Sequence, residues 1–282
     1  MKKSAVRLLF ILICLVFVIS CSDDDDNNLQ STGVNGKPGK VIIKYTDPNS
    51  KDTDVFFYYK ADKLTRTKAI KGSVLDFNYE NNELKSVYTS PEDKEVADGH
   101  GSTKFSKESN KIIIESWGEP SSDLFRWELE LDENNIPVKI TEMGMYSPSG
   151  ANGELSKVRD GEYYSVFTYD QTTKNLVKQI VYNIGTSNIA ATYEYEYDNN
   201  PGAISKIYLP LWYYAYKAYM NREYRNVYNR LFFNYTNNIQ KEIVDTEEGE
   251  SIVNYSYKYN KNNTPVSMGS DIYGLPAISI TY

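Results

Sequence analysis

The sequence has almost none of the residues on which metal centres and nucleophilic catalysis depend. It contains one histidine, His100, and two cysteines, Cys14 and Cys21. With one imidazole, a Ser-His-Asp or Cys-His arrangement can form only at His100, and a zinc site has too few nitrogen and sulfur ligands. His100 lies between Gly99 and Gly101 in a polar stretch, which is typical of an exposed loop residue. We therefore expect no catalytic residue, no metal site, no cofactor and no enzymatic activity.

Positive charge is also scarce. The chain has 31 Lys and Arg against 38 Asp and Glu, so its formal net charge is −7. Removal of a leader that carries Lys2, Lys3 and Arg7 lowers this value by three, to −10. Such a balance argues against nucleic acid and anionic lipid as partners. If Cys14 leaves with the leader and Cys21 is lipidated, no disulfide can form.

The beginning of the sequence predicts a targeting segment over residues 1–20. A positive start is followed by the apolar run Leu8–Ile19, which is too short for a membrane-spanning helix of about 20 residues. The run ends in Val18-Ile19-Ser20-Cys21, which resembles the lipobox of bacterial lipoproteins. That resemblance implies that Cys21 is acylated and holds the protein in the outer membrane. The alternative is an ordinary signal peptide followed by a chance cysteine.

An acidic run follows the cysteine at once. Ser22 precedes four carboxylates, Asp23, Asp24, Asp25 and Asp26, which must stay solvated. The run resembles the surface-export signal of Bacteroidetes lipoproteins, and this implies that the protein faces the cell exterior; the alternative is a soluble tether. We expect residues 21–39 to be a flexible linker and residues 40–282 to form a single domain.

One unit recurs through most of that domain. In Tyr193–Asp198 tyrosines alternate with carboxylates, which predicts a strand with one aromatic and one anionic face. A turn at Asn199–Gly202 and a return strand at Ala203–Ile207 complete the unit. Looser copies surround the anchor residues Tyr59, Tyr79, Leu131, Tyr169, Tyr235 and Tyr259.

The unit resembles the YD-type repeat of the rearrangement-hotspot family, in which Tyr-Asp precedes a Gly/Asn turn and an aliphatic residue. Tyr169-Asp170 and Tyr197-Asp198 match the pair itself. Together with the leader, the chain resembles a family of Bacteroidetes surface lipoproteins of unknown function, and this resemblance implies a porin-like fold.

Many consecutive hairpins predict an all-β, antiparallel up-and-down meander of about 14–16 strands. We expect it to close as a porin-like but soluble β-barrel, or as a strongly curled sheet, because a wide flat sheet leaves edges and an uncovered face. Ser90–Asn110 and Tyr146–Asp160 read as loops. Near residues 211–228 the aromatic spacing predicts one short helix, or a structured insertion, that plugs or caps the sheet; the alternative is an aromatic surface for sugar or a partner.

The loop after the first predicted strand carries oxygen donors at Asp47, Asn49, Asp52 and Asp54. Such spacing is compatible with calcium, but the loop lacks a central glycine and a closing glutamate, so we favour a solvated turn.

Three classes of function remain open. The leading one is a non-catalytic, lipid-anchored surface protein that binds a glycan or a surface protein. The second is a glycoside hydrolase with paired carboxylates, for example Glu194 and Glu196. The third is a carrier with an apolar ligand inside the barrel. We expect the tyrosine face, represented by Tyr195 and Tyr257, to be core rather than a stacking platform.

Overall fold

A computed structural model describes the structure of residues 37–44, 53–61, 63–70, 72–91, 100–118, 123–149, 154–221, 236–271 and 277–282. Everything below concerns these residues. The expected signal peptide, Cys21 and the acidic run of Ser22–Asp26 lie outside them. Three of the four candidate calcium ligands, Asp47, Asn49 and Asp52, also lie outside them.

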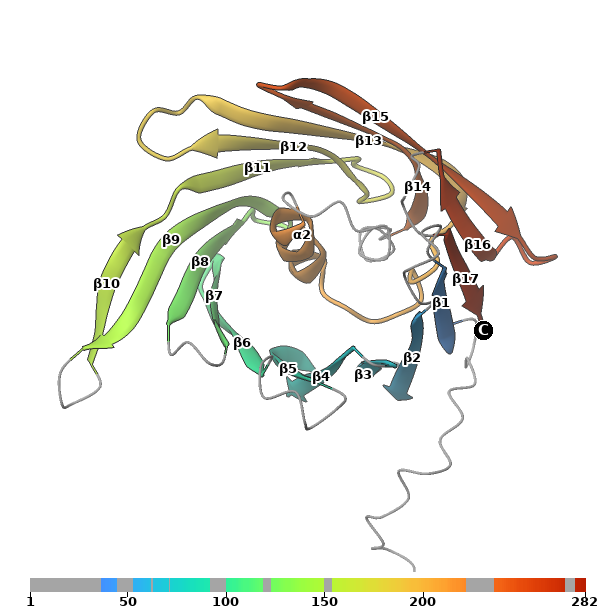
Figure 1. The fold of residues 1–282 in the computed structure, drawn as a ribbon, viewed down its shortest axis with the longest axis horizontal. Coiled ribbons are helices and arrows are strands. Elements are labelled where there is room, and N and C mark those ends of the chain that lie inside the picture. The colour runs from blue at the N-terminus through green and yellow to red at the C-terminus, as the bar shows by residue number, and fades with distance from the viewer. Residues whose placement is uncertain are drawn as a thin grey trace, which may run out of the picture. The chain divides into compact units, whose positions relative to one another are not determined.

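Seventeen antiparallel strands form one closed sheet (Figure 1). They are β1 (Lys40–Lys44), β2 (Thr53–Lys60), β3 (Lys63–Ala69), β4 (Ser73–Glu80), β5 (Glu83–Pro91), β6 (Gly101–Glu108), β7 (Lys111–Gly118), β8 (Leu124–Leu131), β9 (Pro137–Ser149), β10 (Glu154–Asp160), β11 (Tyr163–Tyr169), β12 (Leu176–Asn183), β13 (Ile189–Pro201), β14 (Asn237–Thr246), β15 (Gly249–Tyr259), β16 (Pro265–Ser270) and β17 (Ala277–Thr281). Each strand pairs with its neighbours in the chain, except that β10 and β11 both pair with β9 and not with each other, and β1 pairs with both β2 and β17. This last pairing closes the meander into the expected barrel.

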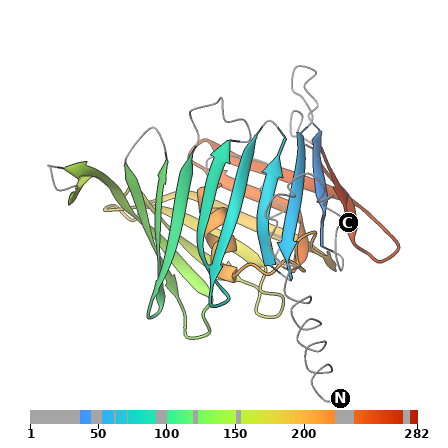
Figure 2. The same ribbon diagram turned by 90° about the horizontal axis from the view of Figure 1, so that it is seen from below.

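The barrel has 16 strand positions, because β10 and β11 share one. The first part of β9 pairs with β11, and its last part pairs with β10. The β9–β10 hairpin therefore extends from the ring as a two-stranded arm (Figures 1 and 2). Every residue of β10 is exposed.

Two glycines make the break between β10 and β11 possible. A Cβ on Gly161 would lie 1.8 Å from the carbonyl oxygen of Glu142. Gly144, opposite in β9, has φ of +123°, and a Cβ there would lie 2.2 Å from the carbonyl oxygen of Arg159. Only glycine lets the two backbones approach this closely. Arg159 also donates to the buried Glu142 carboxylate over 3.2 Å, which ties the base of the arm to the ring.

In several copies of the repeat, an Asp or Asn directly after the anchor residue closes the turn. Asp132 Oδ1 accepts the N–H groups of Asn134 and Ile136, both at 2.8 Å. Asn260 Oδ1 does the same for Asn262 and Thr264. An Asx side chain that accepts from residues two and four places on mimics a backbone turn, and this is why the repeat carries Asp or Asn there. We call the end of the barrel that carries these short turns the Asn-turn end; it is the lower end in Figure 2.

The repeated tyrosines join one hairpin to the next. Tyr197 donates its hydroxyl to the carbonyl of Leu176, the first residue of β12, over 2.6 Å. Tyr257 makes the equivalent bond to Ile239 over 2.8 Å. Tyr282 bonds to Pro265, the first residue of β16, over 2.8 Å. The tyrosine hydroxyl thus satisfies a carbonyl that the sheet ladder leaves at a strand end.

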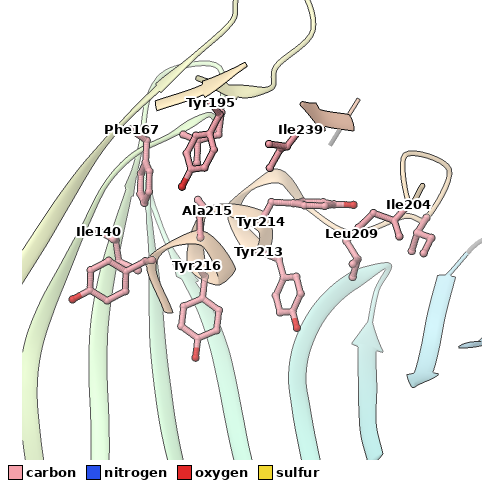
Figure 3. Packing of buried hydrophobic residues seen from close by; sticks show 14 of the residues in the cluster. Ile140, Phe167, Tyr195, Ile204, Leu209, Tyr213, Tyr214, Ala215, Tyr216 and Ile239 are labelled. Carbon is pink, nitrogen blue, oxygen red and sulfur yellow. The ribbon is translucent and has the colours of Figure 1, made fainter. Parts of the chain in front are cut away.

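The lumen is filled by the chain itself. Helix α2 (Leu211–Met220) lies inside the ring, and Ala203, Ile204, Ile207 and Leu209 precede it as buried residues (Figure 1). Inward side chains such as Phe167, Tyr195 and Ile239 surround the helix (Figure 3). Between α2 and the wall, the hollow lined by Tyr169 and Tyr214 has a volume of only about 10 Å³. The plug expected near residues 211–228 is confirmed over α2; residues 222–228 lie outside the described ranges.

Three expectations from the sequence were wrong. Ala203–Ile207 does not return as a strand but forms turns that enter the lumen. Within Ser90–Asn110, residues 101–108 form β6 rather than loop, and Phe105 is the one fully buried side chain of that strand. Tyr146–Asp160 forms the arm instead of a loop. The two regions taken as loops are polar strands. Hydrogen-bonded pairing with the neighbouring strands outweighs their weak β-propensity.

The outer face of the barrel is polar. Lysines or arginines on one strand pair with carboxylates on the next, as in Arg66–Asp76 (2.6 Å), Lys111–Glu128 (2.6 Å) and Lys178–Glu194 (2.6 Å). The buried hydrophobic core faces inward, toward α2. No helix within the described ranges is long and apolar enough to cross a bilayer.

Candidate functional site

The segment that leads into α2 crosses the Asn-turn end of the barrel. Tyr208 forms a bridge with Lys63, and its carbonyl accepts the Tyr79 hydroxyl at 3.5 Å. Its neighbours Ile207 and Leu209 are buried, whereas the Tyr208 side chain is 53% exposed. The alternation of buried and exposed residues anchors this segment by its aliphatic side chains and leaves one aromatic ring facing solvent.

Tyr208 lines three hollows at this end. The first has a volume of about 290 Å³, the second about 690 Å³ and the third about 860 Å³. We call them together the Tyr208 site. The first hollow lies over the amino end of α2, the second over the turns after β2 and β4, and the third beside the end of β13.

The first hollow has an apolar floor and a polar rim. Its floor includes Phe105 and Trp212, whose rings lie 4.8 Å apart between centroids. On the rim, Lys107 donates to Asn135 Oδ1 over 3.0 Å. Lys85 also lies on the rim and pairs with Glu83 at 2.7 Å.

The second hollow is built round Tyr79. Lys63 lies over the Tyr79 ring, with its ammonium 5.1 Å from the ring centroid, and donates to Asn82 Oδ1 over 2.6 Å. Burial and then the neighbouring Tyr208 phenol raise the pKa of Tyr79 well above its ordinary value. The Tyr79 hydroxyl is therefore protonated at neutral pH and acts as a hydrogen-bond donor.

The charge of the site opposes that of the whole chain. The described lining residues of the three hollows include five lysines, Lys60, Lys63, Lys85, Lys107 and Lys206, and one carboxylate, Glu83. The Lys85 hydrogen bond and charge hold the pKa of Glu83 below its ordinary value, so it is ionised and paired. The amino end of α2 carries no carboxylate in its first turn and adds positive potential to the first hollow.

The chemistry of these groups is that of binding. Aromatic rings offer flat apolar faces, the amides of Asn82 and Asn135 offer donors and acceptors, and the ammonium groups offer charge. A pair of carboxylates for acid and base catalysis does not occur among the described lining residues. In the described part of the chain, no three His, Cys, Asp or Glu side chains gather in a way that would hold a metal ion.

The structure places the predicted residues elsewhere. Glu194 and Glu196 lie on the outer face of β13 and pair with Lys178 and Lys241 at 2.6 and 3.0 Å. His100 is half-buried, and its Nδ1 lies 2.8 Å from the Tyr88 hydroxyl. The carboxylate of Asp54, a candidate calcium ligand, pairs with Lys40 at 2.6 Å.

The tyrosine face was predicted correctly as core. Tyr193, Tyr195 and Tyr255 are buried, and Tyr197 and Tyr257 are half-buried, all on the lumen side. Tyr208 itself was missed, because Ala203–Ile207 was taken as a strand. The sequence signal for Tyr208 is local: Tyr208 lies between the aliphatic residues Ile207 and Leu209, and Pro210 follows them.

No protein-family model and no curated protein matches this chain. Among solved structures, a porin-like protein from Bacteroides uniformis is 12% identical, with a TM-score of 0.39, over 86% of this chain and 97% of that one. A porin-like protein from Bacteroides vulgatus is also 12% identical, with a TM-score of 0.40, over 87% and 98% of the two chains. The closed barrel rests on its own strand pairings.

Proposed function

We propose that this chain is a non-catalytic, lipid-anchored surface protein that binds a glycan at the Tyr208 site. The observation that supports a glycan as the ligand is the exposed Tyr208 ring, which lines all three hollows. Sugar rings stack on aromatic faces, and their hydroxyl groups bond to amides and ammonium groups of the kind found on the rims. Among the repeated tyrosines, Tyr79 lines the second hollow, whereas Tyr193, Tyr195 and Tyr255 are buried in the core and do not contribute.

The anchor and the location of the protein are proposed from the sequence. The lipobox-like Val18–Cys21 supports acylation of Cys21, and Ser22–Asp26 supports export to the outer face of the outer membrane. The polar outer face of the barrel supports a tethered domain rather than one that lies in the bilayer. An acyl anchor supplies the membrane attachment that such a barrel lacks.

The two alternative functions, a glycoside hydrolase and a carrier of an apolar ligand, have less support than glycan binding. A hydrolase that uses Glu194 and Glu196 would need both carboxylates in a cleft, and each instead lies on the outer face beside a lysine. A carrier of an apolar ligand would need an open lumen, and α2 with Ile204 and Leu209 fills the described lumen.

Glycan binding is tested with the purified protein on an array of neutral and acidic glycans. We expect binding to a subset, and loss of that binding in Tyr208→Ala. Tyr88→Ala is the matched control, because Tyr88 is 40% exposed but does not line the three hollows. The proposal fails if the array shows no binding, or if both variants bind as the parent does.

A further inference from the structure

We infer that the ligand of the Tyr208 site is an anionic saccharide, one that carries carboxylate or sulfate groups. This inference rests on the proposed function, since it specifies the class of glycan. It starts from the imbalance between five lysines and one carboxylate among the described lining residues, in a chain whose net charge is −7.

The lysines of the site differ from those of the outer sheet face. On that face lysines such as Lys178 and Lys241 pair across strands with glutamates. In the site, Lys63 and Lys107 donate to the neutral amides of Asn82 and Asn135 and form no ion pair with a described residue, and the charge of Lys107 also acts on nearby Glu83. Neutral partners orient an ammonium group and leave its positive potential available to a ligand.

Two further lysines extend the positive potential across all three hollows. Lys60 lines the second hollow and Lys206 the third, and neither forms an ion pair with a described residue. Lys85 in the first hollow is the exception, because Glu83 neutralises it. Glu80 and Glu108 lie in the same turns but do not line the hollows. Among the described lining residues, Lys60, Lys63 and Lys206 have no carboxylate partner, and Lys107 shares the charge of Glu83 with Lys85.

The position of the aromatic rings selects a saccharide over a simple anion. Tyr208 stands between the lysine groups, and Trp212 lies in the floor of the first hollow. Tyr208 shares the second hollow with Lys60 and Lys63 and the third with Lys206, so a saccharide that stacks on its ring can extend toward lysines in either hollow. Concave hollows with an aromatic centre suit a chain of sugar rings better than a flat lipid surface.

The test compares polymers that differ only in charge. Polygalacturonate carries a carboxylate on every ring, and its fully methyl-esterified form carries none; chondroitin sulfate and neutral dextran form a second pair. We expect the purified protein to bind an anionic polymer at least about tenfold more tightly than its neutral counterpart at low salt, and to lose most of that difference at high salt.

A triple variant tests the lysines. Lys60→Gln, Lys107→Gln and Lys206→Gln together should weaken binding to the anionic polymer roughly tenfold or more and leave the melting temperature unchanged. The control combines Lys178→Gln and Lys241→Gln on the outer face, which lowers the positive charge away from the site and should leave binding intact.

The possible failures are distinct. Tyr208-dependent binding that is equal for charged and neutral polymers overturns the anionic ligand and keeps the proposed function. Absence of Tyr208-dependent binding to any saccharide overturns both. Binding to vesicles of phosphatidylglycerol and phosphatidylcholine with the same lysine dependence, without binding to the polymers, overturns the inference in favour of a membrane surface.

Discussion

Asn238 and Asp198 join two strands across the point where the chain leaves the sheet. The backbone N–H of Asn238 donates to Asp198 Oδ1 over 3.2 Å, and its side-chain amide donates to Oδ2 over 3.3 Å. Asp198 also accepts the N–H of Asn200 and the hydroxyl of Tyr259. At Asp132, Asp170 and Asn260, the equivalent residue closes a turn within its own hairpin. Here it holds β13 and β14 together although 40 positions separate the partners.

Asp198→Ala is therefore expected to cost more than the same change in an ordinary copy of the repeat. It leaves several donors of a partly buried network without an acceptor, and we expect the free energy of unfolding to fall by about 2–4 kcal/mol. Asp170→Ala is the control: Asp170 is exposed and accepts only from Thr172 and Thr173, and a loss of about 1 kcal/mol is expected. Denaturant titration measures both, and equal losses would contradict the bridging role.

The sequence was informative wherever the repeat is regular. Alternation predicted the strands on both sides of the turn in the copies around Tyr79 and Tyr169, and the strand before the turn in the copy around Tyr259; the turn chemistry predicted the positions of the turns. The number of strands followed from counting the copies, and closure followed from the problem of free edges. These features are local, so a single sequence contains them.

The parts that the sequence did not reveal depend on tertiary contacts. The central copy has the most regular strand, yet its return segment enters the lumen, because Ile204 and Leu209 gain more burial against α2 than a hairpin offers. β6 has one fully buried side chain, Phe105, and is a strand because β5 and β7 pair with it. The Tyr208 site joins turns from distant copies of the repeat, so no spacing along the chain marks it.

Tyr195→Ala and Glu196→Ala are adjacent changes on opposite faces of β13. Tyr195 is 5% exposed and packs in the lumen, so its truncation is expected to lower the free energy of unfolding by about 3–5 kcal/mol. Glu196 is exposed on the outer face beside Lys241, and its loss should cost less than about 1 kcal/mol. Thermal melts of the two variants measure this difference in stability. A melting temperature for Tyr195→Ala within a degree of the parent would place the tyrosine face outside the core.

Gly161→Ala is expected to disturb the base of the arm. Its Cβ would lie 1.8 Å from the carbonyl oxygen of Glu142, so the backbones of β9 and β11 must separate, at a cost of about 2 kcal/mol or more. Gly118→Ala is the control, because the closest atom to its Cβ, the carbonyl oxygen of His100, lies at 3.4 Å. Hydrogen exchange should report faster exchange at β10 and β11 in Gly161→Ala alone. Unchanged protection there would show that the close approach is not needed.

The anchor is tested by Cys21→Ala, which should abolish incorporation of labelled palmitate, while Cys14→Ala should leave it intact. Replacement of Asp23, Asp24, Asp25 and Asp26 by alanine should preserve lipidation and reduce digestion by protease added to intact cells. Labelling of Cys21→Ala at the parent's level contradicts the lipobox assignment. Equal digestion of the acidic-run variant and the parent would reduce that run to a tether.

The buried tyrosines of the lumen predict a loss of stability at alkaline pH. Burial raises the pKa of Tyr216 from 10.0 to about 12, and burial also raises the pKa of Tyr169. Between pH 10 and 12 the unfolded chain loses the Tyr216 proton and the folded chain retains it. The free energy of unfolding then falls by about 1.4 kcal/mol per pH unit for that residue alone.

Lys217 has the opposite effect below this range. Burial lowers the pKa of Lys217 in the folded chain below 10.5. Between that lowered pKa and about pH 10.5, the unfolded chain holds a proton on Lys217 that the folded chain lacks. The free energy of unfolding therefore rises with pH in this window. The net alkaline loss is therefore expected to begin only above about pH 10. Denaturant titrations from pH 8 to 12 measure it, and Tyr216→Phe should flatten the decline above pH 10, because phenylalanine has no proton to lose. A parent whose stability does not change between pH 10 and 12 would mean that these phenols ionise as readily in the barrel as in the unfolded chain.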